Sequence, residues 1–568
     1  MQKNTLTALL AIALVGSGLS LLVRHSPEQA AAIATPAGGI DLENTRNRLD
    51  QWVHYSRDYN GQRFSPDDQL HRGNVGALEL KWKKTFKYNP AGFQATALVF
   101  DDFLYITDRD SLVKVDPESG DTVWTWSRPE APRAFEAKKY LLGGANRGAV
   151  VSNGRIYKVT NDAHLVCIDA ETGILLWDRV VADDRAGYGL TGAPLVVKDK
   201  VIVGISGAEY GIRGFIDAYN AETGFREWRF WVVPGPGEPG NETWAGDSWQ
   251  RGGGSAWLTG TYDADLDRIY WGTSNPAPVF NGSARQGDNL YTNSIIALNP
   301  DSGELDWYFQ TSPHDLFDWS GVSEPILFEG VFEGKRTPAL VQANRNGYAY
   351  VLDRRDGSLI GAYPFTRVDW AELNAEGKPV IKPELLSAKV REVFPGNAGG
   401  TNWAPKAYSP RTGLLYIPNI ERGSTFVAVP SEYRRGQLYM GGVTTFEDEP
   451  GRGSIEAMDV TNGAIRWSFD TGGPNWGGLL ATAGGLVFGG AFDGKLRAFN
   501  DETGDVLWEY ATGVPAYAPA TTFRIKGKQY IGMSSGFGLI GQGTAGHGPQ
   551  PKGHHYYLFG LPDADHAD

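Results

Sequence analysis

A glycine-rich stretch with a single carboxylate is the first part of the chain that could do chemistry. Residues 204–215 read Gly-Ile-Ser-Gly-Ala-Glu-Tyr-Gly-Ile-Arg-Gly-Phe and follow the apolar run 193–203. That run predicts a hairpin of β-branched residues, so Glu209 lies where a strand ends. Glycine lets the backbone approach a ligand closely or adopt a positive φ. A carboxylate there is either a ligand for a hard cation or a charge in solvent, and this stretch alone favours the second.

Further oxygen donors, guanidinium groups and flat rings occur in similar glycine-rich or strand-end contexts. They are Asn275, Asp315, Asp318, Arg147, Arg213, Arg345 and Trp257. Each one alone is more often a turn former, a solvated charge or a packed ring. Together they combine oxygen ligands that suit Ca²⁺ with guanidinium groups that suit a polyanion. The combination predicts a planar, multiply carboxylated cofactor beside a calcium ion, with Trp257 as a ring to stack on.

Repeats of one short motif indicate which elements position these residues. The unit is an apolar residue, Asp or Asn, three residues, Gly, three residues and Trp, which predicts a strand, a tight turn and a second strand. Six copies end at Trp124, Trp177, Trp228, Trp307, Trp467 and Trp508, and residues 352–361 form a degraded copy without Trp. In the regular regions the Trp residues lie roughly 40–55 residues apart, close to the length of one four-stranded propeller blade. The fold class is therefore all-β, a single β-propeller with Trp-docking repeats.

Both ends of the predicted propeller, residues 41–568, are expected to contribute strands to one blade. Trp82 and the C-terminal run 556–561 are expected to share a split blade that closes the ring and removes exposed sheet edges. Arg367–Gly399 is expected to be an insertion over one face. No linker divides the chain, so residues 41–568 form one propeller domain.

Composition and charge exclude several classes of protein. The chain has 53 basic and 66 acidic residues, a net charge of −13, and no basic cluster, which argues against nucleic acid as a partner. Cys167 is the only cysteine. It rules out an intrachain disulfide, a Cys-rich zinc site, a Cys-x-x-Cys-His haem attachment and a lipoprotein anchor.

The first 40 residues are expected to lie outside the fold. Lys3 precedes an uncharged apolar run from Leu6 to Val23, and Arg24 and an Ala-rich stretch follow. This pattern resembles a secretory signal, and because the run is long, an uncleaved N-terminal anchor is the alternative. Either form predicts export to the periplasm, with membrane contact only if the segment is not cleaved.

From about Gln51 to the last strand, the chain resembles the pyrroloquinoline quinone (PQQ)-dependent alcohol dehydrogenases, the methanol and ethanol dehydrogenase family. The most specific matches are Ser206-Gly-Ala-Glu209 with Arg213-Gly-Phe215, Gly246-Asp-Ser-Trp249, Gly272-Thr-Ser-Asn-Pro-Ala-Pro278, Gly287-Asp-Asn-Leu-Tyr291 and Pro313-His-Asp315. The resemblance implies an eight-bladed propeller with PQQ across its axis. It also implies oxidation of an alcohol to an aldehyde or ketone, with hydride transfer to PQQ.

The resemblance assigns a role to each matching position. Glu209, Asn275 and Asp318 would bind calcium, Asp318 would be the general base, and Arg345 would contact the reactive quinone carbonyl. The remaining cofactor-binding positions would be Gln94, Arg147, Thr191, Ser206, Gly207, Ala208, Trp257, Asn402, Trp403, Trp476 and Gly477.

Two features depart from the family pattern. Leu141-Leu142 occupy the place of an adjacent cysteine pair, and Gln94 replaces an acidic residue. We interpret these two changes as altered tuning of an active enzyme. One further residue bears on the metal: Ser320 stands where lanthanide-using relatives carry an extra Asp, which favours Ca²⁺. Because the chain has no haem-binding cysteines, its electrons would pass to a separate cytochrome c or a membrane quinone.

Two other functions remain open from the sequence. One is a PQQ-binding sensor or a specialised quinoprotein that does not oxidise a simple alcohol, which the missing cysteine pair would suit. The other is a non-catalytic scaffold of the outer-membrane assembly type, built from similar Trp repeats. That scaffold would not need Glu209, Asn275, Asp318 or Arg345. The substrate depends on how Arg367–Gly399 and Glu432–Gly451 fold over the quinone.

Overall fold

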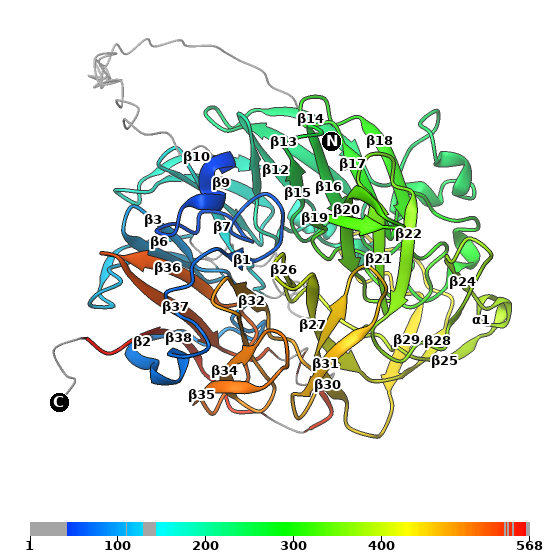
Figure 1. Cartoon of the computed structure of the whole chain (residues 1–568). Helices are drawn as coiled ribbons and strands as arrows, with labels where there is room; N and C mark the ends of the chain where they lie inside the picture. The colour runs from blue at the N-terminus through cyan, green and yellow to red at the C-terminus, as the bar shows by residue number, and fades with distance from the viewer. Residues whose placement is uncertain are drawn as a thin grey trace, which may run out of the picture.

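In the computed structural model, eight sheets are arranged around a central axis like the blades of a propeller (Figure 1). The structure describes residues 42–563 except 110, 129–143, 539–540, 542, 544 and 548–549. The expected export segment 1–40 and the Leu141-Leu142 pair lie outside the described residues. The predicted all-β propeller is confirmed.

We number the blades along the chain from the first complete sheet. The strands of blades 1 to 4 are β3 (Leu98–Phe100), β4 (Phe103–Thr107), β5 (Ser111–Val115), β6 (Thr122–Ser127), β7 (Ala149–Ser152), β8 (Arg155–Thr160), β9 (His164–Asp169), β10 (Leu175–Val180), β11 (Leu195–Val197), β12 (Lys200–Gly204), β13 (Phe215–Asn220), β14 (Arg226–Trp231), β15 (Thr261–Asp263), β16 (Arg268–Gly272), β17 (Ser294–Leu298) and β18 (Leu305–Gln310). Those of blades 5 to 8 are β19 (Ile326–Phe332), β20 (Lys335–Ala343), β21 (Tyr348–Asp353), β22 (Leu359–Pro364), β26 (Ala407–Ser409), β27 (Leu414–Glu421), β30 (Arg452–Asp459), β31 (Ile465–Asp470), β32 (Leu479–Thr482), β33 (Leu486–Gly490), β34 (Lys495–Asn500), β35 (Val506–Ala511), β36 (Thr521–Ile525), β37 (Lys528–Ser535), β38 (His554–Gly560) and β2 (Glu79–Phe86).

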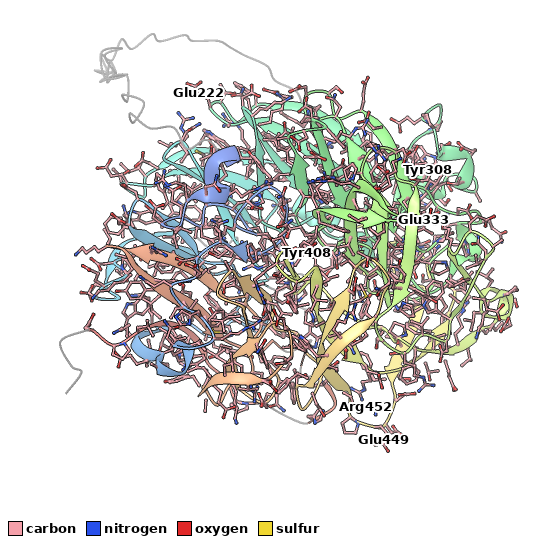
Figure 2. The ribbon with its side chains drawn as sticks, viewed as in Figure 1. Glu222, Tyr308, Glu333, Tyr408, Glu449 and Arg452 are labelled. Carbon is pink, nitrogen blue, oxygen red and sulfur yellow. The ribbon has the colours of Figure 1, made fainter. Side chains whose placement is uncertain are left out.

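The strands differ in burial according to their place in the blade. Strand β12 is buried along its whole length, and β33 likewise, because a neighbouring blade covers each face of these sheets. In the outermost strands, such as β14 and β35, most residues are exposed or half-buried. Charged side chains such as Glu222 and Glu449 lie at the rim of the molecule, and Tyr408 lies near its centre (Figure 2).

Blade 8 is built from both ends of the described chain. Strand β2 pairs antiparallel with β38, with Trp82 opposite Leu558, and β38 pairs in turn with β37. The early strand β2 accordingly lies beside the late strands in Figure 1. The predicted split blade is confirmed. A short strand, β1 (Phe64–Ser65), adds a parallel partner to β32 of blade 7.

The repeat motif joins each blade to the next. Trp228 of blade 3 donates its indole Nε1–H to the Pro300 carbonyl oxygen of blade 4 at 3.0 Å. Gly303 in the same turn has φ +72°, and a Cβ atom there would lie 2.5 Å from Cε3 of Trp228. The motif therefore needs glycine for its backbone conformation and for its contact with the indole. The same glycine–tryptophan contact links Gly120 to Trp82, Gly173 to Trp124, Gly224 to Trp177, Gly357 to Trp307 and Gly504 to Trp467.

We expect Gly303→Ala to lower the free energy of unfolding by about 1–3 kcal/mol more than Gly334→Ala does, because the new methyl group overpacks against Trp228. Gly334 is a matched control, since it has φ +78° and a Cβ atom there would meet nothing within 4 Å. Thermal or denaturant unfolding of both variants measures the difference. Equal destabilisation would show that the indole contact contributes nothing beyond the backbone conformation.

The segment Arg367–Gly399 forms its own small elements. It contains the hairpin of β23 (Ala371–Leu373) and β24 (Pro379–Ile381), the short helix α1 (Pro383–Ser387) and strand β25 (Val390–Val393). Strand β25 pairs with β28 (Ser424–Ala428), which pairs with β29 (Gly442–Phe446). Among the described residues, no helix is long and apolar enough to span a membrane.

Candidate active site

A cavity of about 160 Å³ is enclosed by loops from six blades. This volume far exceeds the roughly 10–15 Å³ that a single water needs. Its walls include ten of the residues expected from the sequence, namely Arg147, Thr191, Ser206, Gly207, Glu209, Trp257, Asp318, Arg345, Asn402 and Trp476. The inner ends of consecutive blades converge on the axis, which explains how residues so distant in sequence share one cavity.

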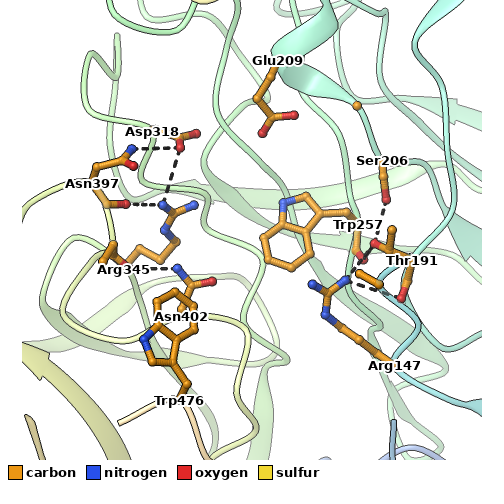
Figure 3. Close-up of a pocket in the computed structure, with 13 residues that line it drawn as sticks. Arg147, Thr191, Ser206, Glu209, Trp257, Asp318, Arg345, Asn397, Asn402 and Trp476 are labelled. Carbon is orange, nitrogen blue, oxygen red and sulfur yellow. Dashed lines mark hydrogen bonds and ion pairs between the residues drawn. The ribbon is translucent and has the colours of Figure 1, made fainter. Parts of the chain in front are cut away.

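One side of the cavity carries a buried cation without an anionic partner (Figure 3). Arg147 is 6% exposed and donates through Nη1 to Thr191 Oγ1 at 2.8 Å. Its guanidinium carbon lies 4.6 Å from the Trp257 ring centroid and 5.1 Å from that of Trp403. Burial lowers the pKa of Arg147 to about 10. Among the described residues no carboxylate pairs with it, so the site favours an incoming anion.

The opposite side holds the expected base in a fixed position. Asp318 Oδ2 accepts a hydrogen bond from Asn397 Nδ2 at 3.1 Å and lies 3.6 Å from Arg345 Nη2. Asn397 also accepts from Arg345 through its backbone oxygen. The other carboxylate oxygen, Asp318 Oδ1, is buried and has no hydrogen-bond partner among the described residues. Asp318 has φ +64°, an uncommon conformation that Asp tolerates and that is often found at functional sites.

Glu209 faces the same part of the cavity as Asp318 (Figure 3). It lies in a 3₁₀ turn between Gly207 and Gly211, which have φ +117° and +63°. Burial raises the pKa of Glu209, and burial with the Glu209 and Asp315 charges raises the pKa of Asp318 to about 7, although Arg345 opposes this. Two carboxylates that share a buried site repel each other, so a cation between them would relieve the cost.

Asn275, the third expected metal ligand, is fully buried beside the cavity but is not part of its wall. Its Oδ1 accepts from Ser274 Oγ at 2.6 Å and from Ser320 Oγ at 2.9 Å. Ser320 thus ties Asn275 to the Asp318 loop through a neutral hydroxyl. Among the described residues no group of three or more His, Cys, Asp or Glu side chains could hold a metal, as expected for a set with only two carboxylates and an amide.

Three more of the expected cofactor residues, Trp403, Ala208 and Gly477, adjoin residues of the cavity wall in space or along the chain. Trp403 lies over the Arg147 guanidinium, and Ala208 and Gly477 adjoin wall residues in the chain. Gln94 donates its side-chain amide to the Ala91 carbonyl oxygen at 2.6 Å, and its Oε1 is buried without a partner among the described residues. Gln94 is the one expected contact whose placement beside the cavity the structure does not show.

Three wall residues were missed by the sequence analysis, namely Ala145, Asn397 and Ala398. Asn397 is the important one, because it bridges Asp318 and Arg345. It lies in the glycine-rich run Pro395-Gly-Asn-Ala-Gly-Gly400, inside the segment that we expected to be an insertion. Like Asn275, it is an amide in a short stretch that contains glycine and proline, which was a usable signal.

The residues present fit PQQ and a hard cation. Arg147 offers carboxylates a buried cation that has no anionic partner among the described residues, and the Trp257 and Trp476 rings offer flat surfaces. A Cβ atom at Gly207 would collide with the Gly187 carbonyl oxygen, so only glycine fits the bend that carries Ser206 and Glu209 around the cavity. The carboxylates of Glu209 and Asp318 and the amide of Asn275 are the oxygen donors that calcium prefers.

Comparison with known families agrees with this geometry. The family model "PQQ: Glucose/ethanol/alcohol dehydrogenase, beta-propeller domain" matches residues 52–376 and 451–531. The chain belongs to the PQQ-dependent alcohol dehydrogenase family. The recognised resemblance is therefore confirmed.

Individual relatives in this family span most of the chain. The quinoprotein alcohol dehydrogenase PedH of Pseudomonas putida is 37% identical, over 84% of each chain. The lanthanide-dependent methanol dehydrogenase of Methylacidiphilum fumariolicum is 35% identical, over 86% of this chain and 85% of its own. Among solved structures, the quinohemoprotein alcohol dehydrogenase of Comamonas testosteroni superposes with a TM-score of 0.86 at 32% identity, over 94% of this chain and 84% of its own. The eight blades of this chain fit the family.

Proposed function

We propose that the cavity binds PQQ with one Ca²⁺ and that the chain oxidises an alcohol to an aldehyde or a ketone. The observation that carries this proposal is the geometry of the Asp318 carboxylate: Asn397 and Arg345 hold one oxygen, and the other has no hydrogen-bond partner among the described residues. When bound, PQQ would supply the oxidant that takes up a hydride from the alcohol carbon, and the metal would act as a Lewis acid. Family membership supports alcohol oxidation in place of a scaffold role.

The chain's own residues would perform the remaining steps. Asp318 Oδ1 would accept the hydroxyl proton of the alcohol, since it is the oxygen of a fixed carboxylate that has no partner in the described part of the chain. Asn397 and Arg345 would keep that oxygen aimed at the substrate. Arg147 and Thr191 would hold cofactor carboxylates, and the buried aromatic rings would exclude water.

The metal is the finer part of the proposal. Relatives in the family include lanthanide-dependent enzymes, whereas here the position two residues after Asp318 is a serine that bonds internally to Asn275. One fewer carboxylate favours Ca²⁺ over a trivalent ion. We expect elemental analysis of protein purified from medium containing both ions to show about one calcium per chain. Recovery of lanthanide in its place would contradict the assignment.

Electrons are proposed to leave to a separate carrier, a cytochrome c or a membrane quinone. Relatives described as quinohemoproteins carry haem by their names, while this chain has a single, buried cysteine, Cys167. Periplasmic export, with or without an uncleaved anchor, is likewise proposed from the sequence. Full activity with NAD⁺ as the sole acceptor would contradict the carrier proposal.

The first test is reconstitution of the protein with PQQ and Ca²⁺, followed by assays of alcohols with an artificial electron acceptor. Turnover that needs both PQQ and metal would support the proposal. Tight PQQ binding without turnover of any alcohol would favour the sensor or specialised quinoprotein. Failure to bind PQQ would overturn the proposal and leave only a scaffold.

A further inference from the structure

Arg285 is a fully buried guanidinium that lies outside the cavity wall. It donates through Nε to the Pro278 carbonyl oxygen at 2.9 Å and through Nη2 to those of Val279 at 3.1 Å and Asp315 at 2.6 Å. Nη1 donates to Asn289 Oδ1 at 2.7 Å. One planar group therefore joins two chain segments that are distant in sequence.

The first segment carries Asn275. Pro276 follows it directly and Pro278 comes two residues later. Because proline fixes φ, this stretch has little backbone freedom. Because Arg285 holds the carbonyl groups at the end of that stretch, it limits where Asn275 can lie. Asn289 also holds the backbone of Arg285, since its Nδ2 donates to the Arg285 carbonyl oxygen at 2.7 Å.

The second segment carries Asp318. Asp315 Oδ1 accepts from the Phe317 amide at 3.0 Å, and Oδ2 accepts from the Trp319 amide at 3.1 Å. These two amides flank Asp318 and hold it in its left-handed conformation. Arg285 holds the backbone of Asp315 itself, so the link runs from the guanidinium to the turn that presents the Asp318 carboxylate.

We propose that Arg285 and Asp315 are positioning residues that set the separation between Asn275 and Asp318 and so determine the affinity for the bound cation. This inference rests on the proposed metal site. A cation with ligands on two separate loops is bound tightly only if the loops are held at the required distance before the cation arrives. Residues that hydrogen-bond to the ligand-bearing loops fix this distance. The guanidinium fork reaches three carbonyl groups and an amide at once, whereas a lysine ammonium has three donors and no fixed plane.

The experiment is a calorimetric titration of CaCl₂ into metal-free protein reconstituted with PQQ. We expect Arg285→Lys to weaken Ca²⁺ binding by about 10–100-fold, the usual effect of losing such a partner. PQQ binding measured without metal should be unchanged, because Arg285 does not line the cavity. Saturating Ca²⁺ should then restore turnover, which a general structural defect would not allow.

Asp315→Asn is the second variant, in case Arg285→Lys does not fold. An amide has one oxygen, so one of the two flanking N–H groups loses its acceptor while the side-chain shape is kept. We expect weaker Ca²⁺ binding here too. Unchanged Ca²⁺ affinity in a folded Asp315→Asn or Arg285→Lys protein would overturn the inference.

Arg57→Lys is the matched control. Arg57 is 2% exposed and donates to the carbonyl groups of Thr45, Arg46, Arg48 and Phe64, none of which lines the cavity. It should lose stability without losing Ca²⁺ affinity, and an equal loss of affinity in this control would overturn the inference. Wild-type protein that binds no Ca²⁺ would instead overturn the proposed metal site, and this inference with it.

Discussion

Asp318→Asn is expected to lower kcat for alcohol oxidation by about 10²–10⁴-fold, the usual contribution of a general base. The amide keeps the shape of the side chain and an oxygen for the metal, but it cannot take up the hydroxyl proton. The contacts with Asn397 and Arg345 show that the protein holds the carboxylate in place. The substitution should therefore remove the proton acceptor and leave the side-chain position nearly unchanged. Steady-state turnover with an artificial acceptor measures the loss, and the absorbance of bound PQQ confirms that the cofactor is retained.

Asp67→Asn provides the comparison for this prediction. Asp67 is 1% exposed and accepts two hydrogen bonds from Arg524, at 2.8 and 2.7 Å, so it is also a buried, paired carboxylate. It does not line the cavity, and kcat should stay near the wild-type value. If Asp318→Asn retained kcat within tenfold of wild type, a different group would have to be the base.

The fold was predictable because each blade carries its own local signal. The Gly of the repeat must have a positive φ and must meet an indole, so both residue types occur at a constant spacing. In the degraded copy at residues 352–361, the sequence pattern no longer identifies the aromatic residue that makes this contact. Tyr363 of blade 5 takes the place of Trp, two residues beyond the expected position, and its ring packs on Gly463 of blade 6. The contact survives in space, although the sequence pattern does not show it.

The site was predictable only in part, for a related reason. Side chains such as Glu209 and Arg345 lie in motifs whose chemistry can be interpreted locally. Asn397 bonds to Arg345 and Asp318, which lie 52 and 79 residues away in sequence, and Arg285 reaches Asp315, 30 residues away. Two of these bonds are accepted by backbone carbonyls. Every residue has a carbonyl, so no residue type marks the acceptor. Such partners become visible only when the fold brings the segments together.

Arg147→Met is expected to have opposite effects on cofactor binding and on the stability of the PQQ-free protein. Among the described residues, Arg147 is buried with hydroxyl, carbonyl and aromatic partners and no carboxylate, so without PQQ its charge is desolvated and has no anionic partner there. Replacing it with an apolar side chain removes that cost, and the Tm of the PQQ-free protein should rise. The loss of a charged partner for the cofactor carboxylates should cost about 2–5 kcal/mol. The Kd for PQQ should therefore rise about 30- to 5,000-fold.

Arg63→Met distinguishes this explanation from a general effect of removing a buried arginine. Arg63 is also fully buried, and burial lowers its pKa to about 10 as well. Its guanidinium, however, donates to the carbonyl groups of Leu479, Tyr55 and Ala520, which would be left unpaired. Calorimetric unfolding of PQQ-free protein should show a lower Tm for Arg63→Met and a higher one for Arg147→Met. A similar fall in both variants, with unchanged PQQ affinity in Arg147→Met, would mean that the cation near Trp257 serves the fold and not the cofactor.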